Sequence, residues 1–177
     1  MSLLMLRELP RYECLKEVAA MVPGMDPVTC AIYFNILWMG DVLARSGGEF
    51  LARYGLNQAR LVILMLLDEA PEGSLRSSKL AEEANVSRAT MTGLLDTMAR
   101  ADLVTRIQES GDRRATQVKI TPKGHDLLKK AGPDFLCWAS QKLAVLNEKE
   151  QDQLNHILSK IQQAFSPGAT ARPHVSL

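Results

Sequence analysis

The chain has 177 residues, of which 46% are hydrophobic and 23% charged, and its formal net charge at pH 7 is +1. This is enough to bury a proper core in one compact domain, or one domain with appended helices, without help from metals or disulfides. The three cysteines, Cys14, Cys30 and Cys137, are odd in number and include no C-x-x-C pair. Their spacing argues against a disulfide framework and a thiolate zinc site, and a reducing cytoplasm fits it best.

The N-terminal segment, residues 1–25, begins with a short apolar run that Arg7, Glu8 and Pro10 interrupt. Neither a signal peptide nor a membrane span fits this pattern. No other stretch approaches the roughly 20 apolar residues that a span requires. We therefore expect no membrane contact.

Apolar residues at helical spacing predict a long helix from Pro27 to about Tyr54, with Asp26 as its N-cap. A second helix is predicted from Asn57, as N-cap, to Glu69. Its central sequence LVILMLL is apolar nearly all round, so this helix should be the buried centre of the domain.

Two further helices, Ser77–Ala84 and Arg88–Ala101, are predicted with only the link 85–87 between them. Each has one apolar side. A helix pair joined by so short a turn has the dimensions of a helix-turn-helix, in which the second helix is offered to the major groove of DNA.

The start of that second helix gathers polar groups. Ser87 is a good N-cap, and Arg88, Thr90 and Thr92 occupy the next turn and a half. Free backbone N–H groups, a positive dipole end, a guanidinium and hydroxyls in one place suit both phosphates and base edges. The alternative is that Ser87 only caps the helix and the threonines only cover its surface.

Alternating sequences at 103–107 and 116–120 predict a β-hairpin after this helix, with Asp112, Arg113 and Arg114 at its tip. A wing in this position lies beside the same duplex, where a narrow groove favours arginine. We expect Asp112 to pair with an arginine and fix the tip. The alternative is a solvated hairpin with a charged turn. Residues 74–124 contain nine basic and six acidic residues, a balance of +3, which leaves −2 for the rest of the chain.

The C-terminal part reads as two helices. The first is predicted from Pro122 to about Val145, with a kink at Gly132-Pro133. Asn147 and Glu150 resemble a capping box that begins the last helix, which carries one wide apolar stripe. The stripe consists of Leu154, Ile157, Leu158, Ile161 and Phe165. It needs a partner, either the rest of the domain or a second copy of the chain. Residues 166–177 are expected to be disordered.

The segments LA…VSRATMTGLLDTM, LVTR and DRRA…ITPKG together resemble the winged helix-turn-helix of the MarR family of bacterial transcription regulators. The resemblance is close over residues 74–124 and extends in outline over 26–165. It implies a mainly α fold with a small β-hairpin wing, binding to double-stranded DNA, and a homodimer formed by N- and C-terminal helices. We accordingly expect a DNA-binding winged helix-turn-helix at 57–121 and a dimerisation region at 26–56 and 122–165. The N-terminal extension, 1–25, could add one short helix to the dimer interface.

The family's contact positions can be carried over onto this sequence. They fall on Ser87, Arg88, Thr90 and Thr92 in the recognition helix and on Asp112, Arg113 and Arg114 in the wing. Two positions depart from the family pattern. Arg76 replaces a frequent Thr or Ser at the start of the first helix, so either Ser77 caps that helix or Arg76 contacts phosphate. Ala101-Asp102 replaces a frequent Gly where the recognition helix leads into the wing.

The resemblance also implies a small aromatic or phenolic effector that binds between the dimer helices and the DNA-binding winged helix-turn-helix. The side chains that could line such a cleft are Tyr33, Trp38, Met39, Met65 and Trp138. The alternative is that they belong to the core. A cysteine-based redox regulator is a further alternative, because Cys30 is placed similarly to the cysteine of peroxide-sensing members, although free cysteines are usually buried apolar residues.

Catalysis is not expected, since no nucleophile-base arrangement such as G-x-S-x-G occurs. His125, His156 and His174 are too scattered for a metal site, and we expect no cofactor. Two classes of function remain. One is a ligand-responsive DNA-binding regulator, repressor or activator, and the other is a module that uses a winged helix for protein contacts. The intact arginines of the reader and the wing tip favour the regulator.

Overall fold

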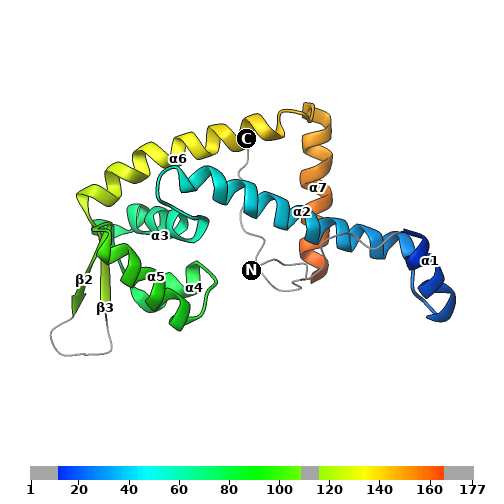
Figure 1. Ribbon diagram of the computed structural model, residues 1–177, viewed down its shortest axis with the longest axis horizontal. Helices are drawn as coiled ribbons and strands as arrows, with labels where there is room; N and C mark the ends of the chain where they lie inside the picture. The colour runs from blue at the N-terminus through cyan, green and yellow to red at the C-terminus, as the bar shows by residue number, and fades with distance from the viewer. Residues whose placement is uncertain (1–11, 109–115, 166–177) are drawn as a thin grey trace. The chain divides into compact units, whose positions relative to one another are not determined.

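The computed structural model describes residues 12–108 and 116–165. The chain divides after Phe135 into two units, Met1–Phe135 and Leu136–Leu177. Helices dominate the described residues, and the sheet is small, so the predicted fold class is confirmed (Figure 1). In chain order the elements are α1 (Tyr12–Met21), α2 (Pro27–Ala52), α3 (Gln58–Glu69), a 3-10 turn (Pro71–Gly73), β1 (Ser74–Arg76), α4 (Ser77–Glu83), α5 (Arg88–Arg100), β2 (Val104–Gln108), β3 (Thr116–Ile120), α6 (Pro122–Leu143) and α7 (Glu148–Phe165).

Helix α2 begins where the sequence predicts. The Asp26 carboxylate accepts hydrogen bonds from the backbone N–H groups of Val28 and Thr29, both at 3.1 Å, and these bonds satisfy donors that have no partner inside the helix. At the other end, the Leu56 N–H donates to the carbonyl of Leu51 at 3.1 Å. Gly55 makes this turn possible with a φ of +66°.

Helix α3 is central to the core but not buried all round. The Asn57 side chain caps it by accepting from the Arg60 N–H at 2.9 Å, as predicted. Leu61, Ile63, Leu64 and Leu67 are buried, but Val62 and Met65 remain 40% and 39% exposed. The helix lies at the centre of the core, as expected, and one side of its apolar sequence is exposed. The core cluster around α3 also includes Leu80, Met91, Leu95, Met98, Val104 and Val118.

The helix-turn-helix is formed by α4 and α5. Helix α4 ends in a left-handed residue, Asn85 with φ +51°, and the following Val86 N–H donates to the carbonyl of Ala81 at 3.0 Å. Asparagine tolerates this conformation, and the bond closes the last turn of α4. Ser87 then caps α5, so the chain reverses within four residues, as the sequence predicts.

The wing contains one strand more than the sequence analysis expected. Strands β2 and β3 pair antiparallel, as predicted, with Arg106 opposite Val118. The short strand β1 adds to the other edge of β3, with Leu75 opposite Val118, so the strand order is β1-β3-β2. The sheet thereby anchors the root of the wing to the chain segment that leads into α4.

At the root of the wing, the end of α5 is bound to the start of α6. Asp102 takes the left-handed conformation, φ +59°, that a glycine often supplies. The hydroxyl of Thr121 donates to the Asp102 carbonyl at 2.7 Å, and the ammonium of Lys123 donates to the Ala101 carbonyl at 2.9 Å. Gly124 lies so close to Leu103 that a β-carbon there would come within 2.2 Å of the Leu103 carbonyl oxygen. The sequence ITPKG therefore has a structural role, because it binds the start of α6 to the end of α5.

In the second unit, α7 begins with the predicted capping box. The Asn147 side chain accepts from the Glu150 N–H at 3.0 Å, and the Glu150 carboxylate accepts from the Asn147 N–H at 2.9 Å. Most of the predicted apolar stripe of α7 is exposed, with Ile157 at 52% and Phe165 at 71%. Helix α6 continues through Pro133 as one element.

Helix α2 is long and apolar enough to cross a membrane, by length and composition alone. This corrects the expectation that no stretch approaches the length of a span. None of the apolar window is buried, and Ile32, Met39 and Leu43 are between 46% and 51% exposed. One such helix is weak support for a membrane, because the core helix of a soluble protein and a signal sequence pass the same test of length and composition.

Candidate nucleic-acid interface

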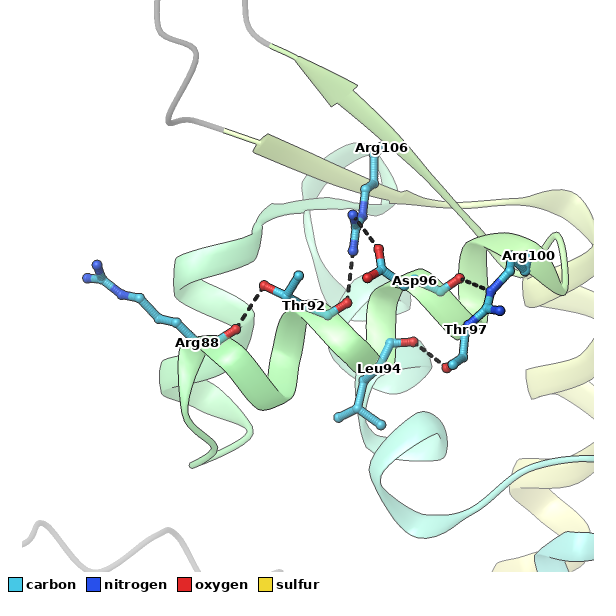
Figure 2. Close-up of polar contacts among 7 residues, drawn as sticks. All are labelled: Arg88, Thr92, Leu94, Asp96, Thr97, Arg100 and Arg106. Atoms are coloured by element: carbon cyan, nitrogen blue, oxygen red, sulfur yellow. Dashed lines mark hydrogen bonds and ion pairs between the residues drawn. The ribbon is translucent and has the colours of Figure 1, made fainter.

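The N-terminus of α5 presents free donors to solvent. The Ser87 hydroxyl oxygen accepts from the Thr90 N–H at 3.1 Å and lies 2.8 Å from the Thr90 hydroxyl. Arg88 is exposed and points away from the helix (Figure 2). No acidic side chain within 12–108 or 116–165 pairs with its guanidinium. A cation, backbone N–H groups and a positive dipole end therefore coincide at this point, which suits a phosphate or the edge of a base.

Thr92 lies one turn further along α5 and is exposed. Its hydroxyl donates to the carbonyl of Arg88 at 2.9 Å (Figure 2). Because the donor is already used, Thr92 offers solvent an acceptor oxygen and a methyl group in this arrangement.

A solvent-open hollow of about 690 Å³ lies between α4 and the start of α5. Cations and small polar groups line much of it, among them Arg76, Lys79, Ser87 and Arg88. Lys79 pairs with Glu83 at 2.9 Å and with Glu82 at 3.3 Å, and these hydrogen bonds, that of Glu83 first, raise the pKa of its ammonium. Lys79 is therefore neutralised by its glutamates, whereas the guanidinium of Arg88 has no carboxylate partner among the described residues.

The start of α4 differs from the expectation. Arg76 occupies the N-cap position, and its side chain makes no capping hydrogen bond. Ser77 is the first helical residue, so the idea that Ser77 caps α4 is wrong. Arg76 is exposed at the edge of the hollow, where contact with a phosphate stays a prediction.

Arg106 connects the wing to the recognition helix. One terminal nitrogen of its guanidinium, Nη1, lies 2.7 Å from the Asp96 carboxylate, and the other, Nη2, donates to the main-chain carbonyl of Thr92 at 3.0 Å (Figure 2). From the sequence, Arg106 is only one of the nine basic residues in 74–124. The alternation of the strand was the signal that could have found this contact, because Arg106 shares a face of β2 with the buried Val104 and must therefore point toward α5.

The predicted residues of the wing tip, Asp112, Arg113 and Arg114, lie outside the described residues. The strands on both sides of the tip, β2 and β3, are described. The contacts assigned to these three residues stay predictions.

The side chains assigned to an effector cleft are not buried together in the structure. Tyr33, Trp38, Met39 and Met65 are 39–48% exposed, and Trp138, which is half-buried, belongs to the second unit. The alternative that these side chains belong to the core therefore does not explain the first four. Cys30 is half-buried with a free thiol. No group of three or more potential metal ligands occurs within the described part of the chain.

The two helices α4 and α5, together with the three-stranded sheet, define a winged helix-turn-helix, a class of DNA-binding fold. The model of the MarR family matches residues 56–116. The repressor YetL of Bacillus subtilis is 27% identical over 91% of this chain and 96% of its own length. Residues 56–116 are thus a MarR-family winged helix-turn-helix, and the relatives that the chain matches are transcriptional regulators. The family is one of transcriptional regulators and not of enzymes.

Solved structures of the family share the fold. Sco3205 of Streptomyces coelicolor, determined in complex with DNA, has a TM-score of 0.72 at 19% identity and covers 86% of this chain and 97% of its own. NadR, determined in complex with 4-hydroxyphenylacetate, has a TM-score of 0.55 at 25% identity and covers 73% of this chain and 91% of its own.

Proposed function

We propose that this MarR-family regulator binds a pseudo-palindromic operator in double-stranded DNA as a homodimer, in the cytoplasm, and that a small aromatic effector modulates its binding. The observation that carries the proposal is the start of α5, where the exposed Arg88 guanidinium has no described acidic partner. Such a group can neutralise a phosphate or read a guanine edge without first breaking an ion pair.

In this proposal α5 enters the major groove. Ser87 and Thr90 face the backbone or base edges from the first turn, and Arg88 and Thr92 are the base readers. Arg76 and Ser77, at the start of α4, contact phosphate beside the hollow. Asp112, Arg113 and Arg114 of the wing reach the neighbouring minor groove or backbone, where narrow grooves attract arginine.

Exposed apolar faces support a homodimer. Large apolar side chains are exposed on α2, among them Ile32, Met39 and Leu43, and on α7, where they include Ile157 and Phe165. Contiguous apolar surface of this kind marks interaction sites. A second copy of the chain would cover them and hold two recognition helices about one turn of DNA apart, roughly 34–36 Å.

The effector proposal rests on exposed aromatic and methionine side chains of the first unit. Tyr33, Trp38, Met39 and Met65 offer apolar surface and, at Tyr33, a hydroxyl. NadR was determined with an aromatic acid, 4-hydroxyphenylacetate, and a planar acid of this kind is the class of ligand we propose here. A true effector must weaken DNA binding and must itself be bound less tightly when DNA is present.

A gel-shift competition tests DNA recognition against the alternative of a protein-interaction module. We expect the chain to shift DNA from the upstream region of its own gene in the presence of excess unrelated duplex. Arg88→Ala should weaken this binding and relax its preference at one operator position, by about 1–3 kcal/mol if the contact is bidentate. Lys149→Ala removes one positive charge from α7, outside the proposed DNA interface. This variant is the matched control and should bind DNA like the wild type. Equal binding by wild type and Arg88→Ala would remove Arg88 from the reader, and no binding to any duplex would favour the interaction module.

A further inference from the structure

We propose that Asp96 and Arg106 form a wing clamp, a pair of positioning residues that fixes the wing against the recognition helix for DNA binding. The inference rests on the proposed function. It adds two residues that touch each other and Thr92, and that need not touch DNA themselves.

The clamp joins two elements through one planar group. Arg106 on β2 uses Nη1 for the Asp96 carboxylate, at 2.7 Å, and Nη2 for the Thr92 carbonyl, at 3.0 Å (Figure 2). Both partners lie on α5, one turn apart. A guanidinium can make these contacts together because its donors are held in a rigid fork, whereas a lysine ammonium presents a single point of charge.

The clamp contributes little to folding. The side chains of Arg106 and Asp96 are 33% and 50% exposed, and ion pairs as exposed as these are screened by water and stabilise weakly. The core beneath the wing is formed by other residues, including Val104 and Val118 on the strands and Leu95 on α5. The effect we expect from the pair is therefore a fixed orientation of β2 relative to α5.

The position of the clamp links it to base reading. Thr92, whose carbonyl Arg106 holds, is one of the proposed base readers, and its hydroxyl is bonded to the carbonyl of Arg88. One chain of contacts thus runs from the wing strand to the first turn of the recognition helix. The wing and the helix should consequently engage DNA as a unit, and loss of the clamp should uncouple them.

Asp96→Asn gives the sharpest test because two accounts predict opposite signs. If Arg106 were a phosphate contact restrained by Asp96, removing a carboxylate from a DNA-binding surface would tighten binding. If the pair is a clamp, Asp96→Asn should weaken operator binding by about two- to fivefold, the range expected for loss of a partly exposed ion pair. Asp126→Asn, which removes an exposed carboxylate from α6, is the matched control and should not weaken binding.

A double-mutant cycle tests whether the two residues act as one. Arg106→Gln and the double variant should weaken binding to a similar extent, because the Asp96 substitution has no contact left to break once the guanidinium is gone. Asp96→Asn alone should weaken binding less, because the bond from Arg106 to the Thr92 carbonyl remains. Arg106→Lys should recover part of the affinity. In footprints on the operator, the clamp variants should lose protection of the minor groove at the wing and keep protection of guanine N7 in the major groove. Thermal unfolding should change by no more than a few degrees, roughly, in every variant.

The outcomes separate the clamp from the proposed function. Tighter binding by Asp96→Asn, additive losses in the double variant, or an unchanged minor-groove footprint would overturn the clamp while leaving the DNA-binding proposal intact. If the wild-type chain binds no duplex, the proposed function fails, and the clamp with it.

Discussion

Single residues at the root of the wing hold the recognition helix in place. The Cα of Gly124 approaches the Leu103 carbonyl so closely that a β-carbon would come within 2.2 Å of that oxygen. The hydroxyl of Thr121, which is 7% exposed, accepts from the Gly124 N–H at 3.0 Å and donates to the Asp102 carbonyl at 2.7 Å. Only glycine therefore fits at position 124. The atom that a β-carbon would meet is the Leu103 carbonyl oxygen, which belongs to the backbone and cannot rotate away as a side chain could.

Gly124→Ala should destabilise the fold by about 1–3 kcal/mol, because the added methyl group must push apart α6 and the chain at Leu103. Gly93 is the matched control, since it lies in the interior of α5 and a β-carbon there would meet nothing within 4 Å. Gly93→Ala should stabilise by roughly 0.5–1 kcal/mol through its higher helix propensity. Urea unfolding measures both. Similar shifts of the midpoint in the two variants would refute the close approach at Gly124.

At the scale of elements, local signals in the sequence predicted most of the helices. The caps at Asp26, Asn57 and Ser87 were visible because capping depends on one polar side chain and the N–H groups two or three residues later. Strand β1 was missed because three residues carry no periodicity, and because its partner strand β3 is distant in the sequence. The side chains of Ser74 and Gln117, which are hydrogen-bonded across the two strands, lie 43 residues apart. Local patterns do not encode such pairings.

Three features of the structure could not be predicted from the sequence. The exposure of Val62 and Met65 on α3 depends on which elements cover that helix, and an apolar run alone does not specify this. The contact of Arg106 with Asp96 depends on how β2 crosses α5. The glycine-like φ of Asp102 is a third case, because aspartate adopts that conformation only where the surrounding structure requires it.

The cap of α2 should make stability depend on pH. Hydrogen bonds to the Asp26 carboxylate, that of the Thr29 hydroxyl first, hold the pKa of Asp26 below its ordinary value of 3.8. A pKa depressed by folding means that the carboxylate stabilises fully above the unfolded-state pKa and loses this effect as the pH falls through the folded-state pKa. Asp26→Ala should therefore be less stable than the wild type at neutral pH, and the difference should shrink below about pH 4.

Asp26→Asn serves as the control for this titration. Asparagine keeps a capping oxygen but has no proton to gain, so the Asn variant should remain more stable than the Ala variant across the whole acid range. Chemical unfolding at several pH values measures both differences. A constant gap between wild type and Asp26→Ala down to low pH would show that the carboxylate charge is not what caps α2.

Two helices expose apolar side chains that no other described element covers. This surface lies on α2 in the first unit and on α7 in the second, with Leu43 at 51% and Ile157 at 52% exposure. The helical stripe of α7 was predicted from its spacing, but the sequence alone left open whether the same chain or a second copy covers it. The homodimer that we propose would cover both faces.

Removing the last helix should therefore change the assembly. Deletion from Asn147 onward should convert the proposed dimer to monomers or aggregates, because it removes the exposed stripe that a partner would cover. Ile157→Glu should have the same effect with one substitution, since a charge in an apolar interface is costly. Gln153→Glu adds the same charge at an exposed polar position of α7 and should leave the dimer intact. Light scattering distinguishes these outcomes, and an unchanged dimer after the deletion would exclude α7 from the interface.

An anisotropy titration over a range of salt concentrations measures whether this chain reads DNA sequence as a dimer, as we propose. With a duplex from its own upstream region, the wild-type protein should bind at two chains per site. Its log affinity should fall linearly with log salt, with a slope of about −0.9 for each phosphate neutralised. A scrambled duplex of the same length should show weaker binding at every salt concentration. Equal affinity for the two duplexes, or binding that does not depend on salt, would contradict the account.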